Sequence, residues 1–417
     1  MAKSRNIYPV VSFGKAQSAL AKRALPKSTN RVYMDYAASV SPNPSSIHVL
    51  GVEAKMKLQN ARAEVANILK TRPEEIIFTS GGTESNNLAI QGVVLRTWEL
   101  GSQEGAELQQ IPHIITTNIE HPSVLETFKM LQKRKLAEIS IVSVEKNGIV
   151  DPKKIKKELK RNTILVSVMY VNNEIGTIQP IKEIAKEVRY FRKHSKNLSV
   201  FPLLHTDAVQ AVNYLDLNVE KLGVDLLSLS GSKIEGAGRV GVLYKKKSVS
   251  LAAIFSGGDQ EMGLRPGTEN LPEILKFSKA LKLVQENKEK ESKRLTKLRD
   301  YFFNKLHHSN ILTNIGMIIN GDLENRLPNN INISFPKIPS DLLVLELSAK
   351  GIMVSSKSAC KSSQKEGSYV IQAIRPESDI EIGGLRFSLG KNIIKSDIDY
   401  TIKVLVEILK KSKKWYD

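Results

Sequence analysis

The strongest constraint on the fold of this chain is an alternation of short apolar runs with segments of helical period, which begins near residue 74. Each run has the length of a strand, and the runs are EIIFTS (75–80), HIITTNI (113–119), ISIVSV (139–144), TILVSVMYV (163–171), VFPLLHTD (200–207), DLLSLSG (225–231) and VGVLYK (240–245). Strands that are apolar on both faces and alternate with helices are typical of a mostly parallel sheet sandwiched by helices. The sequence therefore predicts an α/β fold.

The pattern changes after residue 271 and predicts a second, smaller domain. A charged helix is expected over 272–308, followed by a strand at 329–335, a helix at 340–350, a strand at 384–390 and a helix at 397–415. We interpret residues 33–271 as a large α/β domain and residues 272–417 as a small α+β domain.

Residues 1–32 are interpreted as a basic arm. The first 34 residues contain no Asp or Glu, although several Lys and Arg are present. Organellar transit peptides share this composition, but here Lys outnumbers Arg and no clean amphipathic stripe is present. We expect a disordered or loosely docked arm and a cytoplasmic protein, with a mitochondrial or other organellar location as the alternative.

The net charge of +19 is spread over polar helices, which we interpret as solvated helix faces. No nucleic-acid motif is found, so no specific nucleic-acid partner is expected. No apolar run is long enough to span a bilayer, so no membrane association is expected. No zinc-knuckle spacing occurs, and no metal is predicted. A single cysteine, Cys360, excludes an internal disulfide.

In sheets of this kind ligands bind beyond the carboxyl ends of the strands, so the residues that follow each run carry the most information. After the run at 75–80 comes Ser80-Gly81-Gly82-Thr83, and a helix follows. Thr83 is a good N-cap, and a helix N-terminus with free N–H groups can hold a phosphate. A turn without a ligand explains these residues equally well.

Four further strand ends carry polar residues. His121 is a possible proton shuttle, YVNNEIG (170–176) ends a strand with two amides, and Asp207 and Gln210 follow another strand. Lys233 follows a buried-looking strand, where partial desolvation favours a neutral, nucleophilic amine. Each has a simpler explanation as a surface, core or turn residue.

Together, these residues predict a site for pyridoxal 5'-phosphate. A lysine can form a Schiff base with this cofactor, and a carboxylate can keep its ring nitrogen protonated. The glycine turn would take the phosphate. The combination is much more specific than any of its parts.

The sequence also resembles the cysteine desulfurases, a family in the fold-type-I, class V aminotransferase group of pyridoxal phosphate enzymes. The resemblance runs from residue 33 to the C-terminus. It rests on the motifs YMDYAA, NPSSIHVLG, TSGGTESNN, EHPSV, VNNEIGT, HTDAVQ, SGSK, LRPGTEN, SKSAC and LRFSLG.

This resemblance assigns roles at the cofactor. Lys233 would carry the Schiff base, and His121 would stack on the ring and handle protons. Asp207 would pair with the pyridine nitrogen and Gln210 with the ring hydroxyl. The phosphate would be held by Gly82, Thr83, Ser230 and Ser232.

It also assigns the substrate and subunit contacts. Asn173 and Arg386 would bind the substrate carboxylate, a task that suits the fork of a guanidinium. Thr268 would reach the phosphate of a neighbouring subunit, which implies a homodimer.

Cys360 would be the nucleophile that takes sulfur from L-cysteine, leaving a persulfide and releasing alanine. Lys357 and Lys361 flank it and favour the reactive thiolate. Its Ser-, Lys- and Gly-rich surroundings predict a mobile loop. The acceptor of the sulfur would be an iron–sulfur scaffold protein or a tRNA-thiolation protein.

The chain departs from the family pattern at three places. Ser232 replaces an imidazole that contacts the phosphate, so weaker cofactor binding is expected, and Lys357 replaces a glycine. Only residues 36–42 separate Asp35 from Asn43, where relatives carry a helix-bearing insertion that helps to wall the substrate entrance. This last difference leaves substrate choice open.

Two alternatives to a cysteine desulfurase remain. A selenocysteine lyase or another pyridoxal-phosphate-dependent sulfur-amino-acid lyase would use the same residues. A non-catalytic partner in sulfur transfer is disfavoured, because Lys233, His121, Asp207, Arg386 and Cys360 are all present.

Overall fold

The structure is a computed structural model, and it describes residues 32–103, 110–195, 201–335, 338–356, 367–376 and 383–416. The proposed basic arm, apart from its last residue, and Cys360 lie outside the described residues. Within the described residues, no helix has both the length and the apolar composition that crossing a membrane requires.

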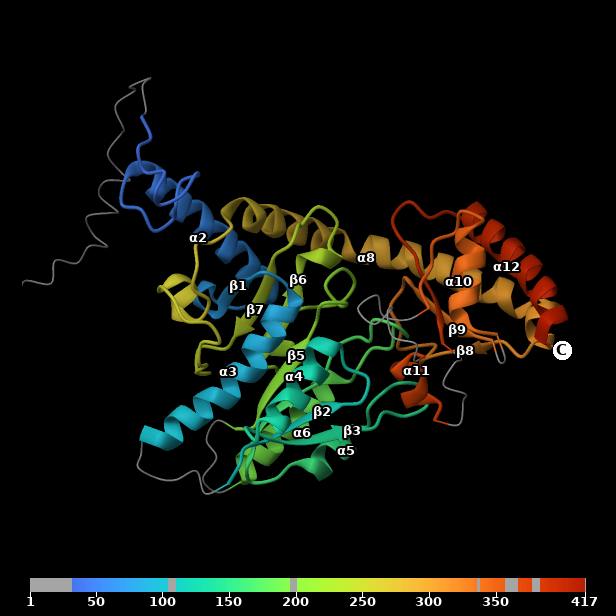
Figure 1. Cartoon of the computed structure of the whole chain (residues 1–417), viewed down its shortest axis with the longest axis horizontal. Coiled ribbons are helices and arrows are strands. Elements are labelled where there is room, and N and C mark those ends of the chain that lie inside the picture. Colours follow the sequence, from blue (N-terminus) through green and yellow to red (C-terminus); the bar gives the residue numbers. More distant parts are fainter. Residues whose placement is uncertain are drawn as a thin grey trace, which may run out of the picture.

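A seven-stranded sheet forms the centre of the larger part of the molecule (Figure 1). Its strands are β1 (Ile76–Thr79), β2 (His113–Thr117), β3 (Glu138–Val142), β4 (Thr163–Ser167), β5 (Leu203–Asp207), β6 (Leu226–Ser230) and β7 (Gly241–Lys245). The spatial order is β1-β7-β6-β5-β4-β2-β3, in which only β7 runs antiparallel to its neighbours. The seven apolar runs all form strands, and the predicted mostly parallel sheet is confirmed.

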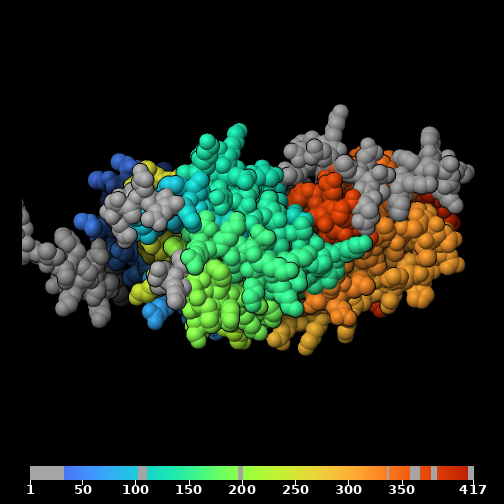
Figure 2. All heavy atoms as spheres, turned by 90° about the horizontal axis from the view of Figure 1, so that it is seen from below, coloured from blue at the N-terminus to red at the C-terminus, as the bar shows by residue number. Residues whose placement is uncertain are grey.

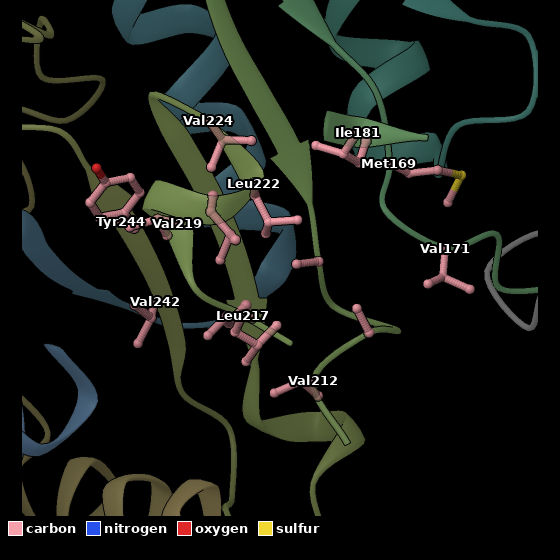
Figure 3. Close-up of a cluster of buried hydrophobic side chains, with 14 of the residues drawn as sticks. Met169, Val171, Ile181, Val212, Leu217, Val219, Leu222, Val224, Val242 and Tyr244 are labelled. Carbon is pink, nitrogen blue, oxygen red and sulfur yellow. The ribbon is translucent and has the colours of Figure 1, made fainter. Parts of the chain in front are cut away.

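Helices cover both faces of this sheet, as the uninterrupted apolar runs predict. The helices of this part are α2 (Val49–Leu69), α3 (Gly82–Gln103), α4 (Pro122–Lys133), α5 (Pro152–Glu158), α6 (Ile181–His194) and α7 (Val219–Leu222). Neighbouring strand residues belong to different cores: Ile77 and Ile114 pack with α3 and α4, whereas Ile76 and Ile115 pack with α2 and α6. Figure 3 shows part of the second core, with Val242 and Tyr244 of β7 among its side chains.

A second, three-stranded antiparallel sheet has the order β10-β9-β8. It consists of β8 (Ile318–Ile319), β9 (Asn330–Ser334) and β10 (Leu385–Ser388), with α9 (Asn310–Asn314), α10 (Ser340–Ser348) and α12 (Lys395–Tyr416) around it. The long helix α8 (Leu271–His307) joins the two parts (Figure 1). Its Phe277 is buried in the larger core and its Phe302 in the smaller one. The predicted small α+β domain therefore has its own core, while its exact boundaries stay a prediction.

Helix α11 (Tyr369–Ile374) was not expected from the sequence. It belongs to the C-terminal part of the chain, yet Val370, Ile371 and Ile374 are buried in the core of the larger part. In the space-filling view its red surface lies between the green and the orange regions (Figure 2). Its six residues are too few to give a helical period in the sequence.

Candidate active site

Ten of the residues singled out in the sequence line one cavity of about 530 Å³, and they come from six separate segments. These residues are Gly82, Thr83, His121, Asn173, Asp207, Gln210, Ser230, Ser232, Lys233 and Arg386. A larger cavity of about 650 Å³, between α2 and the turn η3 (Gln260–Gly263), contains none of them. The strand-end rule thus places these residues together, although nothing in the geometry alone assigns their roles.

A chain of hydrogen bonds joins Asp207 to His121 through two residues to which the sequence assigned no role. The side-chain amide of Asn86 donates to Asp207 Oδ2 at 2.7 Å and to Ser123 Oγ at 2.8 Å. Ser123 Oγ lies 2.8 Å from His121 Nδ1. The backbone N–H of Val209 donates to Asp207 Oδ1 at 3.0 Å. The buried carboxylate is therefore held in a fixed orientation, as a buried charge requires.

His121 is the N-cap of α4, and the backbone N–H of Ser123 donates to its Nδ1 at 3.1 Å. A neutral ring that accepts at Nδ1 carries its proton on Nε2. Burial lowers the pKa of His121; Asp207 opposes this shift, and Lys233 reinforces it. The neutral imidazole is therefore favoured at neutral pH.

The turn between β1 and α3 leaves no room for a side chain at Gly82. A Cβ atom there would lie 2.8 Å from Val209 Cγ2 and 3.3 Å from Ser230 Cβ. Helix α3 already begins at Gly82, so Thr83 lies inside its first turn rather than at the predicted N-cap. Ser230 Oγ and Ser232 Oγ lie 2.9 Å apart across the same end of the cavity. This end offers hydroxyl groups and a helix N-terminus, the groups that bind phosphate.

Lys233 differs from its expected environment, because it is exposed rather than partly buried. It ends the 3-10 turn η2 (Gly231–Lys233), which follows the buried Ser230. The turn begins at the buried Gly231, and the next two residues, Ser232 and Lys233, are exposed and line the cavity. Asn213 donates to the Lys233 carbonyl at 2.6 Å and fixes the backbone at this edge.

Three consecutive residues after β4 have different tasks. Asn172 is buried and accepts from the N–H groups of Glu174 and Ile175, which shapes the turn. The carbonyl of Asn173 accepts from Arg386 Nη1 at 2.9 Å. Burial lowers the pKa of Arg386, and the charge of Glu174 works in the opposite direction. The turn therefore places Arg386 and Asn173 side by side at the cavity.

Buried polar atoms without a hydrogen-bond partner in the described part of the chain concentrate at this cavity. Five of the eight such atoms belong to residues that line it: Asn86 Oδ1, Asn173 Oδ1, Asn213 Oδ1, Asn329 Oδ1 and Arg386 Nε. Unpaired buried groups are costly, and their convergence is typical of a ligand site. Hydroxyl groups at one end, a carboxylate, a lysine and a guanidinium fit a phosphorylated pyridine aldehyde and an amino acid. No group of three His, Cys, Asp or Glu residues in the described ranges could hold a metal ion.

Two predicted residues are not brought into this cavity. Thr268 is exposed and lies outside it, after η3. Cys360 lies outside the described residues, so its position is not tested. Conversely, sequence reasoning missed Asn86, Asn213 and Asn329. Asn86 stands within the quoted motif TSGGTESNN, but only its three-dimensional contact with Asp207 reveals its function.

Comparisons with known proteins define the class first. The chain matches the family described as "Aminotransferase class-V" over residues 11–401, and it belongs to that family. This family implies pyridoxal phosphate as cofactor, in agreement with the donors in the cavity.

Within that class, the chain belongs to the cysteine desulfurase family. It is 41% identical over 397 residues to the "Cysteine desulfurase IscS" of Dictyoglomus turgidum, covering 91% of this chain and 95% of that relative. It is 40% identical over 369 residues to the protein of the same name from Methanosarcina thermophila, covering 88% and 85%. A solved NifS-like protein has a TM-score of 0.76 at 35% identity, covering 88% of this chain and 91% of that chain.

Proposed function

We propose that the protein is a cysteine desulfurase that uses pyridoxal phosphate on Lys233 to convert L-cysteine into L-alanine and a persulfide on Cys360. The observation that carries this proposal is the convergence of Lys233, Asp207, His121 and Arg386 in one cavity. Membership of the cysteine desulfurase family supports the reaction type.

When bound, pyridoxal phosphate withdraws electrons from the substrate and thereby labilises its Cα–H and C–S bonds. Asp207 would accept the ring N–H, and the donors Asn86 and Val209 would keep its carboxylate in place for this contact. Gln210 would bind the ring hydroxyl, and the phosphate would be held by Gly82, Thr83, Ser230 and Ser232. The hydroxyl of Ser232, 2.9 Å from that of Ser230, would donate where the family pattern has an imidazole.

His121 and Lys233 move protons. The hydrogen bond to Nδ1 keeps the proton of the neutral His121 ring on Nε2, so this atom is the one that donates. The amine of Lys233 lines the same cavity and would serve as a base for the substrate Cα proton. Burial of His121 favours the neutral form that this exchange requires.

Arg386 and Asn173 bind the substrate carboxylate. The guanidinium is half-buried, its Nη1 donates to the Asn173 carbonyl, and its buried Nε has no hydrogen-bond partner in the described part of the chain. A carboxylate would pair with that donor and with the Asn173 side chain. This contact orients the thiol of the substrate relative to the cofactor.

In the sulfur-transfer step, the Cys360 thiolate attacks the sulfur of the substrate. A new S–S bond forms, and the C–S bond breaks with its electron pair remaining on the substrate carbon. Protonation of that carbon gives alanine, and the outer sulfur stays on Cys360 for an acceptor. An iron–sulfur scaffold protein and a tRNA-thiolation protein are both chemically suitable acceptors.

We further propose a homodimer in which Thr268 reaches the cofactor phosphate of the neighbouring subunit. Large apolar side chains that are more than half exposed support such an interface: Met34, Tyr36, Val40, Ile47 and Met262. Residues 32–48, which carry four of them, lie beside α2 at the end of the molecule opposite the small domain (Figure 1). Met262 of η3 lines a cavity together with Pro44 and Ser45 of that segment.

The test begins with purified full-length protein loaded with pyridoxal phosphate. We expect a yellow absorption that is lost in Lys233→Ala, and L-cysteine with a reductant should yield alanine and sulfide. Cys360→Ala should retain the yellow species but release much less sulfide. Equal sulfide release by wild type and Cys360→Ala would refute the persulfide mechanism. A parallel assay with L-selenocysteine separates a desulfurase from a selenocysteine lyase.

A further inference from the structure

Helix α11 is fastened to the turn that supports the substrate site. Its N-cap, Ser368, is almost fully buried, and its hydroxyl donates to Glu174 Oε2 at 2.5 Å. The same hydroxyl accepts from the Ile371 N–H at 3.1 Å. Both hydrogen-bonding functions of Ser368 are therefore used, and Glu174 fixes the point at which α11 begins.

Glu174 is itself rigidly held. Only 2% of its surface is exposed, and its carbonyl accepts from the side-chain amides of Asn330 and Asn332, each at 3.0 Å. It directly follows Asn173, whose carbonyl binds Arg386. Glu174 therefore links two contacts. Its side chain binds the N-cap of α11, and its neighbour in the chain, Asn173, binds Arg386.

A second hydrogen bond fastens α11 close to His121. The Tyr369 hydroxyl donates to the carbonyl of Glu120 at 2.6 Å. The side-chain carboxyl group of Glu120 accepts from the N–H of Met169 and from the Thr117 hydroxyl, so the backbone carbonyl of Glu120 belongs to a buried, fixed strand end. The helix therefore contacts the residues next to two groups of the site, His121 and Asn173.

On the other side of residues 357–366, Ser355 contacts Arg386 directly. The two residues exchange backbone hydrogen bonds of 3.2 and 2.7 Å. The described residues on both sides of the segment with Cys360 are therefore anchored at the site. Ser355 pairs with Arg386 before it, and Ser368 binds Glu174 after it.

We propose that Glu174 and Ser368 are positioning residues for sulfur transfer. Their hydrogen bond holds the start of α11 in register with Asn173 and Arg386, and so sets where the chain that carries Cys360 returns relative to the bound substrate. The inference rests on the proposed desulfurase function, and neither side chain needs to touch the substrate.

The test compares Ser368→Ala, Ser368→Thr and Glu174→Ala with a matched control, Ser278→Ala, in holoenzyme. Ser278 is also buried and donates to a glutamate, Glu64, at 2.7 Å. This hydrogen bond joins α8 to α2 and lies away from the cavity. Loss of either partner should lower kcat for alanine formation about tenfold, the effect of about 1.4 kcal/mol in the barrier. In Ser368→Ala the KM for L-cysteine should change less than about twofold, because Arg386, Asn173 and the charge of Glu174 all remain.

Ser368→Thr keeps the hydroxyl and should restore kcat, whereas Ser278→Ala should lose stability without losing activity. The double variant Ser368→Ala/Glu174→Ala should fall no further than either single variant, as expected for residues that act as a pair. Because Cys360 is the only thiol in the chain, iodoacetamide modification reports on it alone. Its rate should rise in Ser368→Ala and stay unchanged in Ser278→Ala.

The possible failures are distinct. If wild type forms no alanine from L-cysteine, the proposed function is wrong. If wild type is active and Ser368→Ala keeps its kcat, or if Ser278→Ala lowers kcat equally, the positioning role is wrong.

Discussion

Two adjacent glycines at the start of α3 provide a sharp test of how the phosphate end of the cavity is built. At Gly82 an added Cβ would lie 2.8 Å from Val209 Cγ2 and 3.3 Å from Ser230 Cβ. At Gly81 the nearest atom, Ser230 Oγ, is 4.0 Å away. Alanine should therefore be rejected at one position and accepted at the other.

The magnitude follows from the overlap. Carbon atoms pack best at roughly 3.5–4.0 Å, so a contact at 2.8 Å demands a shift of about 0.7 Å or more. Val209 is β-branched and stiff, and overpacking of this kind typically costs about 1–3 kcal/mol. The gain from replacing glycine, about 0.4–1 kcal/mol, offsets only part of this cost at Gly82. At Gly81 no steric cost opposes this gain, because the nearest atom is 4.0 Å away.

We therefore expect Gly82→Ala to lower the free energy of unfolding by about 1–2 kcal/mol and Gly81→Ala to raise it slightly. Val209 precedes Gln210 and its backbone N–H donates to Asp207, so its displacement should also weaken pyridoxal phosphate binding about tenfold, or about 1.4 kcal/mol. Urea unfolding of the cofactor-free protein measures the first effect, and absorbance titration with pyridoxal phosphate measures the second. If Gly82→Ala is as stable as Gly81→Ala and binds the cofactor equally well, the steric reasoning is wrong.

Three further predictions concern charge, stability and the subunit contact. Burial lowers the pKa of His205 to about 3 from its ordinary 6.5, so below pH 6.5 the unfolded chain binds a proton that the folded chain does not. Stability should fall by about 1.4 kcal/mol per pH unit through this residue down to about pH 3, and urea unfolding should show a shallower pH slope for His205→Asn; identical slopes would contradict this. Arg62→Met leaves the carboxylate of Glu261 buried without the two hydrogen bonds of 2.6 and 2.7 Å that it now receives, and should cost about 3–5 kcal/mol in urea unfolding. The double variant Arg62→Met/Glu261→Leu should recover much of this stability. If the stability losses of the two single substitutions simply add in the double variant, the two side chains do not act as a pair. Thr268→Val should weaken cofactor binding about tenfold in the dimer while leaving the unfolding of the cofactor-free chain unchanged, and unaltered affinity would exclude the proposed contact across subunits.

The sequence predicts the fold well because strands buried on both faces leave a clear mark. Runs such as TILVSVMYV cannot be solvated on either face, and the alternation of β1 residues between two cores confirms this. Helix α11 could not be predicted in the same way, because it is short and its stability comes from burial of Val370 and Ile371 in a distant part of the chain.

The site was predictable only where function and strand ends coincide. Asp207 and Lys233 follow apolar runs, so their positions alone suggest a ligand site. Asn86 lies on a helix among other polar residues, and nothing in the sequence shows that it faces Asp207 from 121 residues away. The exposure of Lys233 was missed for a related reason, because the turn through Gly231 is a property of the backbone rather than of the residue types.

The ionisable side chains of the cavity have two tasks, ligand binding and proton transfer. Lys233 and Arg386 are two cationic side chains against a single carboxylate, Asp207, which suits a phosphate and a substrate carboxylate. A protonated His121 would add a third positive charge and strengthen anion binding, but its Nδ1 could no longer accept the Ser123 N–H. Burial lowers the pKa of His121 and so keeps the ring neutral, in the form that α4 is built to cap. Binding of the substrate carboxylate therefore depends on the guanidinium of Arg386, whereas proton transfer depends on Lys233 and on the neutral ring of His121.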